Sequence, residues 1–102
     1  MSNKMSISSD RINQNMRIDE QYKSIGISLF RSIIGDKNIH PNTVSDKIEE
    51  LHKRSGASFY RIFRTVEECS DTIYKTLSRK YFSSHYGKLA YVSKIVENHL
   101  ND

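Results

Sequence analysis

The stretch from Thr43 to Arg64, TVSDKIEELHKRSGASFYRIFR, decides the fold of this chain. The apolar residues of its first half recur at the three- and four-residue spacing of one buried helix face: Val44, Ile48 and Leu51. A break follows at Lys53-Arg54-Ser55, and Ser55 is a good N-cap for a short second helix that ends near Arg64. Two short helices joined by a tight turn are typical of a helix-turn-helix.

Helical periodicity also dominates the rest of the sequence, and strict alternation of apolar and polar residues is scarce. We expect a helix at about 18–34 that ends at Gly35, a helix at 65–82 that opens with a Thr65/Glu68 capping box, and a helix at 88–100. Asn42 or Thr43 should cap the helix that carries Val44. The sequence therefore predicts an all-α protein, a compact bundle of four to five helices containing a helix-turn-helix.

Specific side chains are expected in the core of this bundle. One set comes from all parts of the chain: Phe30, Ile48, Phe59, Phe63, Ile73 and Leu77. The first helix should bury one stripe: Tyr22, Ile25, Leu29 and Ile33. Tyr81 should also point inward, and the last helix should bury a stripe of its own: Val92, Ile95, Val96 and Leu100.

Residues 1–16, MSNKMSISSDRINQNM, differ in composition from the rest of the chain. They are mostly Ser, Asn and Asp with scattered apolar residues, too few to bury enough surface to offset the entropy lost on ordering. We therefore predict a flexible N-terminal arm at 1–16 and one helical domain at 17–102. Deleting the arm should leave the melting temperature nearly unchanged.

The composition narrows the possible partners and location. The net charge is +4. The segment from Lys53 to Lys88 contains eight basic and three acidic residues, and this excess of positive charge favours a polyanionic partner. The single cysteine, Cys69, fits a reducing compartment. No apolar run is long enough for a signal sequence or a membrane span, so we expect a cytoplasmic protein with no membrane partner.

On a helical wheel, the expected helix at 55–64 separates into two sides. The apolar side chains share one side and should be buried: Phe59, Ile62 and Phe63. The opposite side carries small, basic and hydroxyl-bearing side chains: Ala57, Ser58, Tyr60, Arg61 and Arg64. Arginine can contact guanine through two hydrogen bonds, a hydroxyl can reach a base or a phosphate, and a small residue allows close approach. This pattern is typical of a recognition helix for double-stranded DNA.

The candidate DNA-binding residues follow from that assignment. We expect base contacts from Ala57, Ser58 and Arg61. Phosphate contacts should come from Lys53, Tyr60, Arg64 and the cap region near Thr43. Arg54 and Ser55, next to Lys53 in the chain, complete the set of candidate DNA-binding residues.

The segment Ser55-Gly-Ala-Ser-Phe59-Tyr-Arg61-Ile-Phe63-Arg64 resembles the first helix-turn-helix of AraC-type transcription activators. That family has a capping Ser, an apolar residue at +4, Arg at +6, Phe at +8 and a basic residue at +9, and all of these positions match. Tyr74 and Arg79 fall where the family has a Tyr and an Arg on its linker helix. The stripe from Val92 to Leu100 resembles the opening helix of the second helix-turn-helix.

Two departures from the AraC pattern stand out. Glu68 replaces the usual glycine after the recognition helix, and the sequence ends before a second recognition helix. The resemblance thus implies a bacterial-type transcription regulator that has one recognition helix or is incomplete.

Two further families show partial resemblance. The pattern Tyr22-x2-Ile25-Gly26-x2-Leu29-Phe30 is similar to the first helix of TetR-type repressors, and Ile48 through Phe63 to their reading unit, although His52-Lys53 replaces their Ala-Gly turn. Residues 25–48 resemble the AriR/YmgB type of small bacterial regulators, which would imply a helical dimer acting on other proteins.

Catalysis and cofactor binding are not expected. The four histidines and Cys69 lack zinc-ligand spacing, and the sequence has no phosphate-binding glycine loop or nucleophile elbow. We therefore expect no enzyme activity, no cofactor and no metal. The alternative function is a small helical interaction module that modulates a regulator or secretion component without binding DNA. A homodimer through the C-terminal helices is expected from their many aromatic residues: Tyr74, Tyr81, Phe82, Tyr86 and Tyr91.

Overall fold

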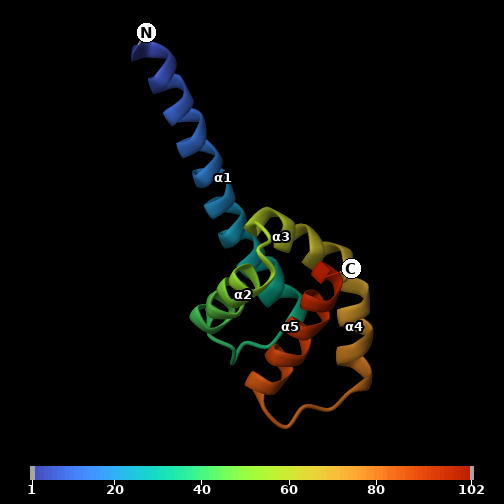
Figure 1. Cartoon of the computed structure of the whole chain (residues 1–102). Helices are drawn as coiled ribbons and strands as arrows, with labels where there is room; N and C mark the ends of the chain where they lie inside the picture. The colour runs from blue at the N-terminus through green and yellow to red at the C-terminus, as the bar shows by residue number, and fades with distance from the viewer. Residues whose placement is uncertain (1, 102) are drawn as a thin grey trace.

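Residues 2–101 form five helices in the computed structural model, which describes side chains from residue 18 to residue 101 (Figure 1). The helices are α1 (Ser2–Ile34), α2 (Pro41–Ser55), α3 (Phe59–Glu68), α4 (Ser70–Arg79) and α5 (His85–Asn101). This part of the chain contains no strand, so the predicted all-α bundle of four to five helices is confirmed. None of these helices is both long and apolar enough to span a membrane.

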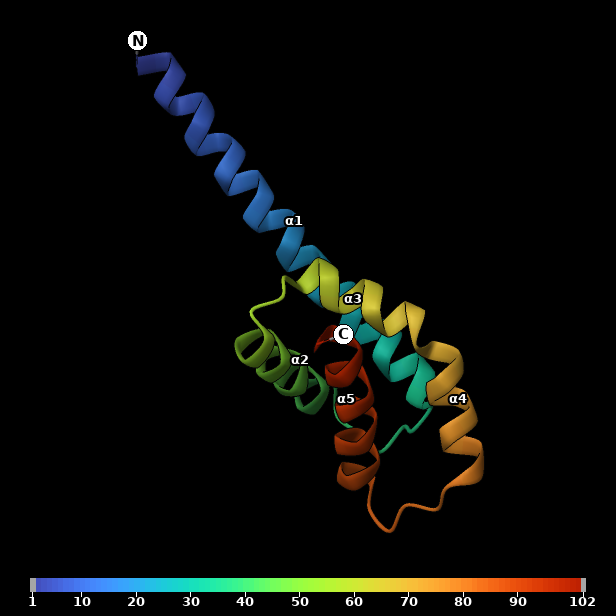
Figure 2. The same ribbon diagram turned by 45° about the vertical axis from the view of Figure 1, so that its right-hand side comes forward.

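Helix α1 is longer than the sequence predicted. It was expected from about residue 18, whereas it begins at Ser2 and includes most of the segment 1–16 that we assigned to a flexible arm. The C-terminal half of α1 packs among the other helices, and its N-terminal half extends away from them (Figures 1 and 2). The molecule is therefore elongated, with extents of 62 × 28 × 20 Å. The side chains of residues 1–17 lie outside the described part, and the mobility of the arm stays a prediction.

The loop between α1 and α2 is tied to the start of α5. Gly35 ends α1 with a left-handed backbone (φ 66°), as predicted. The buried carboxylate of Asp36 accepts hydrogen bonds from the backbone N–H of Asn38 (3.0 Å), from His85 and from Lys88 Nζ (3.4 Å). These bonds, that from Asn38 most strongly, lower the pKa of Asp36 to about 2. The loop is thus held by a carboxylate that is ionised at neutral pH.

Helix α2 begins one or two residues before the expected cap. His40, not Asn42 or Thr43, is the N-cap, and its Nδ1 accepts a hydrogen bond from Asn42 N (3.0 Å). Pro41 takes the first helical position, where its missing N–H costs nothing. The predicted buried face is confirmed: Val44, Ile48 and Leu51.

The boundaries predicted for the third helix were wrong by one turn. Ser55 does not cap a new helix: its hydroxyl donates to Leu51 O (2.6 Å) and accepts from Ala57 N (3.0 Å) at the end of α2. Gly56 then takes a left-handed conformation (φ 72°) and terminates α2. Ser58 is the cap of α3, and its Oγ accepts from Arg61 N (3.1 Å). The helix expected at 55–64 therefore occupies 59–68.

The capping box predicted at Thr65 and Glu68 is also absent. Thr65 lies buried within α3, and its hydroxyl donates to Arg61 O (2.8 Å). Helix α4 starts only at Ser70 and ends at Arg79, before Phe82. Because Tyr81 follows the end of α4, its side chain is 88% exposed, and its predicted inward position was wrong.

The core lies between the C-terminal half of α1 and the four other helices. Its completely buried side chains come from every helix: Phe30, Val44, Ile48, Ile62, Val66, Ile73, Leu89, Val92 and Val96. Of the predicted core set, Phe30, Ile48, Phe59 and Ile73 are buried. Phe63 and Leu77 are only half-buried.

Of the stripe predicted for the first helix, Ile33 is buried as expected, and Tyr22 and Leu29 are half-buried against the core. Ile25 is 48% exposed, and the adjacent Gly26 faces α3 instead, since a Cβ at Gly26 would lie 3.8 Å from Phe63 Cβ. In α5, Val92, Val96 and Leu100 are buried as predicted, and Ile95 is half-buried.

Candidate nucleic-acid interface

The connection from α2 to α3 is short and internally braced. It consists of Gly56–Ser58, the length of turn that the sequence predicted for a helix-turn-helix. His52 Nδ1 donates to Ala57 O (2.6 Å), and the imidazole stacks on the Phe59 ring with centroids 4.2 Å apart. His52, in the last helical turn of α2, therefore holds both the α2–α3 connection and the first residue of α3 in place.

Helix α1 holds the N-terminal end of α3. The Asp19 carboxylate accepts hydrogen bonds from the backbone N–H of Phe59 (3.3 Å) and of Tyr60 (3.0 Å), which have no partner within α3. The negative charge also lies at the positive end of the helix dipole. Asp19 thus occupies a position where a helix-turn-helix can offer backbone donors to a phosphate.

Aromatic contacts extend the junction of α1 with α3. Tyr22 lies edge-on to Tyr60, with ring centroids 4.7 Å apart, and its centroid is 5.5 Å from that of Phe63. An ion pair between Lys23 and Glu49 joins α1 to α2. The α2–α3 unit therefore packs on the C-terminal half of α1 through aromatic contacts and an ion pair.

The outward side of α3 carries four of the predicted DNA-binding residues. Ser58, Tyr60, Arg61 and Arg64 are exposed, and Tyr60 retains 45% of its surface. The opposite side is buried through Phe59, Ile62 and Val66. The side of α3 that we predicted to face DNA is therefore open to solvent at these four residues.

Two of the three predicted base-contacting residues are placed differently from expectation. Ala57 is 8% exposed, because the later start of α3 puts it in the turn rather than on the helix surface; its predicted contact with a base was wrong. Arg61 is exposed, but its Nη2 donates to Leu100 O (3.2 Å). That carbonyl belongs to the last turn of α5, where backbone acceptors lack helical partners and a cation is favourable.

Arg64 and Lys53 are two predicted phosphate contacts that are exposed to solvent. Arg64 lies one turn after Tyr60 on α3, and its Nη1 is 3.0 Å from Glu67 Oε1 in an exposed ion pair. Such surface ion pairs contribute little to stability, so Arg64 can exchange the glutamate for another anion. Lys53 is exposed on α2.

Thr43 and Ser55, two further predicted site residues, are less available to a partner than the exposed residues of α3. Thr43 is half-buried in the first turn of α2, about 18 Å along the helix axis from Ser55 at its other end. Ser55 is half-buried and already bonded within α2. Lys53 lies in the last turn of α2, and Ser58, Tyr60, Arg61 and Arg64 follow the short connection to α3, whereas Thr43 lies at the other end of α2.

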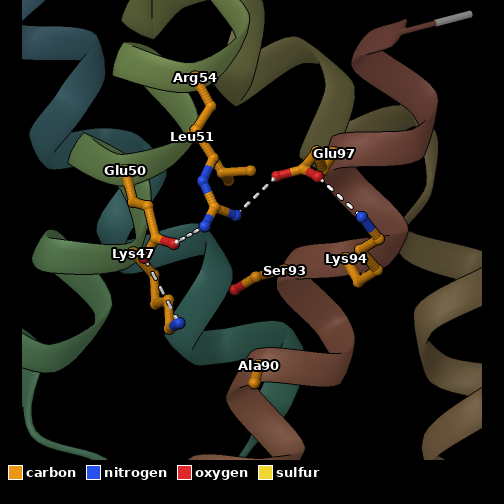
Figure 3. Close-up of a pocket in the computed structure, with 8 residues that line it drawn as sticks. All are labelled: Lys47, Glu50, Leu51, Arg54, Ala90, Ser93, Lys94 and Glu97. Carbon is orange, nitrogen blue, oxygen red and sulfur yellow. Dashed lines mark hydrogen bonds and ion pairs between the residues drawn. The ribbon is translucent and has the colours of Figure 1, made fainter.

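Arg54 is drawn into a chain of ion pairs between α2 and α5 (Figure 3). Its guanidinium lies 3.0 Å from Glu50 and 3.4 Å from Glu97, and Glu97 is also 2.9 Å from Lys94. Hydrogen bonds from Lys94 and then from Arg54 lower the pKa of Glu97. The predicted role of Arg54 in DNA binding therefore competes with a structural role between two helices.

The described residues offer no metal site. No group of three or more His, Cys, Asp or Glu side chains in this part of the chain could hold a metal ion. Cys69 is buried at the junction of α3 and α4, and burial raises the pKa of its thiol.

Two residues of this interface were not anticipated from the sequence. Asp19 is distant from α3 in the chain, and His52 lies five residues before the carbonyl that it contacts. Neither position carries a local signal that would identify its contact with the turn or with α3.

No family model, curated protein or solved structure matches the chain. The resemblances to AraC-type, TetR-type and AriR/YmgB-type proteins therefore rest on sequence motifs alone.

Proposed function

We propose that this protein is a transcription regulator of bacterial type that binds double-stranded DNA through its α2–α3 unit. The observation that carries the proposal is the two-sided structure of α3. One side is fixed in the core by Phe59, Ile62 and Val66, and the other presents Ser58, Tyr60 and Arg64 to solvent beside a short braced turn. A cytoplasmic location, as expected from the sequence, accords with this role.

The exposed residues have distinct parts in the proposed complex. Arg64 lies on the outward side of α3, where its guanidinium can contact guanine or a phosphate through paired hydrogen bonds. Ser58 and Tyr60, at the start of α3, offer hydroxyl groups to the sugar-phosphate backbone. Lys53 adds a phosphate contact from α2. Arg61 contributes charge while its guanidinium also holds the end of α5.

A second candidate is the helical interaction module that binds another protein and no DNA. The specific observation in its favour is Asp19, whose carboxylate already fills the N-terminal end of α3. Exposed tyrosines on α4 and α5 offer this module a contact surface, and self-association through these helices stays a prediction.

A binding titration on duplex fragments separates the two candidates. Arg64→Ala should weaken binding to the preferred duplex by about 1–3 kcal/mol. Lys94→Ala is a matched control, because both cations are exposed and each pairs with a glutamate three residues later (3.0 and 2.9 Å). Lys94→Ala should leave the affinity unchanged. Equal effects of the two substitutions, or no duplex binding by the wild type, would favour the interaction module.

A further inference from the structure

A second charged surface lies at the C-terminal end of α4, apart from the α2–α3 unit. Lys75, Arg79 and Lys80 are exposed there, together with Tyr74 (52% exposed) and Tyr81 (88% exposed). We call these five residues the α4 surface. Helix α4 stands at the edge of the molecule in both ribbon views (Figures 1 and 2). The surface is therefore open to a large partner.

The cations of the α4 surface form no ion pair with the described side chains. Elsewhere most lysines and arginines pair with acids: Lys23, Lys47, Arg54, Arg64, Lys88 and Lys94 each lie within 4.0 Å of a carboxylate. No such pair involves Lys75, Arg79 or Lys80 among residues 18–101. The nearby acids are concentrated around the start of α4: Glu67, Glu68 and Asp71. Along α4 and the residues after it, the basic side chains therefore gather toward the C-terminal end, away from these acids.

The backbone after α4 directs Tyr81 outward. Lys80 has an extended conformation (φ −116°, ψ 133°), in which successive side chains point to opposite sides. Lys80 Nζ lies 4.1 Å from the centroid of the Tyr91 ring, and the Phe82 ring packs edge-on against the same tyrosine at 5.6 Å. Both neighbours of Tyr81 are therefore anchored on α5, and the intervening ring is left with both faces open to solvent.

We propose that the α4 surface binds single-stranded nucleic acid. Lys75 and Arg79 would neutralise phosphates, and unpaired bases would stack on Tyr81 and Tyr74. A duplex fits this surface less well, because its bases are stacked on one another and offer no free face to a ring. A second copy of this chain would bring like charges together. The proposal stands independently of duplex binding by the α2–α3 unit.

The test uses the full chain and a fluorescein-labelled oligo-dT of about 15 nucleotides, within the site size of one small binding domain. Tyr81→Ala should weaken binding about tenfold, since it removes one stacking platform. Tyr86→Ala is the matched control: Tyr86 is also exposed (59%) but lies on the side of α5 that faces Lys47 of α2. It should leave binding to oligo-dT unchanged.

Charge is tested separately with two double variants. Lys75→Gln/Arg79→Gln should reduce the slope of log affinity against log salt by about 1.4, given about 0.7 for each phosphate contact on a single strand. Lys37→Gln/Lys94→Gln removes the same charge elsewhere and should preserve the slope. Absence of oligo-dT binding, or equal effects of target and control variants, would overturn the proposal. Arg64→Ala should affect duplex binding only, so failure of either surface can be recognised without the other.

Discussion

Phe30→Ala is expected to lower the free energy of unfolding by about 3–5 kcal/mol. Phe30 is 1% exposed, in the half of α1 that packs on α2, α3 and α4. Removing the ring leaves a cavity at the meeting point of these helices, where rigid helical backbones limit collapse. The measurement is urea unfolding followed by circular dichroism at 222 nm.

Tyr81→Ala serves as the control for this prediction. Its ring is almost fully exposed, so the free energy of unfolding should change by less than about 0.5 kcal/mol. A loss below about 1 kcal/mol for Phe30→Ala would show that α1 does not form the centre of the core.

Duplex affinity should fall about 40-fold between about 50 and about 200 mM NaCl. The basis is the three exposed cations of the α2–α3 unit, Lys53, Arg61 and Arg64, each of which would release counterions from a phosphate. Three contacts correspond to a slope near −2.7 in log affinity against log salt. The measurement is fluorescence anisotropy at several salt concentrations.

Lys53→Ala provides the internal check on this slope. It should reduce the slope by about one unit and weaken all duplex sequences alike, since a phosphate contact carries no base preference. Affinity that is insensitive to salt in both proteins would contradict the assignment of these cations to phosphates.

The fold was predictable where it depends on local apolar periodicity. Val44, Ile48 and Leu51 repeat along one face of α2, and Val92, Val96 and Leu100 along one face of α5, so burial followed directly. Gly35 ended α1 as expected because glycine readily takes the left-handed conformation. These features need no knowledge of distant contacts.

The boundaries of α3 were not predictable, because they depend on contacts between helices. Ser55 and Ser58 are equally good caps by type, and the choice is made by Asp19 on α1 and by His52 on α2. The resulting shift moved Ala57 from the helix surface into a buried turn.

In the candidate site, too, features set by the local sequence were predictable and features set by contacts between helices were not. The exposure of Ser58, Tyr60 and Arg64 was predicted, since the apolar face of the helix remains the same whichever serine caps it. The bond between Arg61 and Leu100 O was not, because it joins residues far apart in the chain. Tyr81 was misplaced because no proline or glycine marks the end of α4.

The most direct test of the central claim is an amide chemical-shift titration of the ¹⁵N-labelled protein with duplex DNA. If the α2–α3 unit binds the duplex, shifts should concentrate on the backbone amides of residues 53–64. The amide signals of α5 should not shift, except near Leu100, which contacts Arg61. No shifts at saturating duplex, or shifts that leave 53–64 unchanged, would contradict the claim.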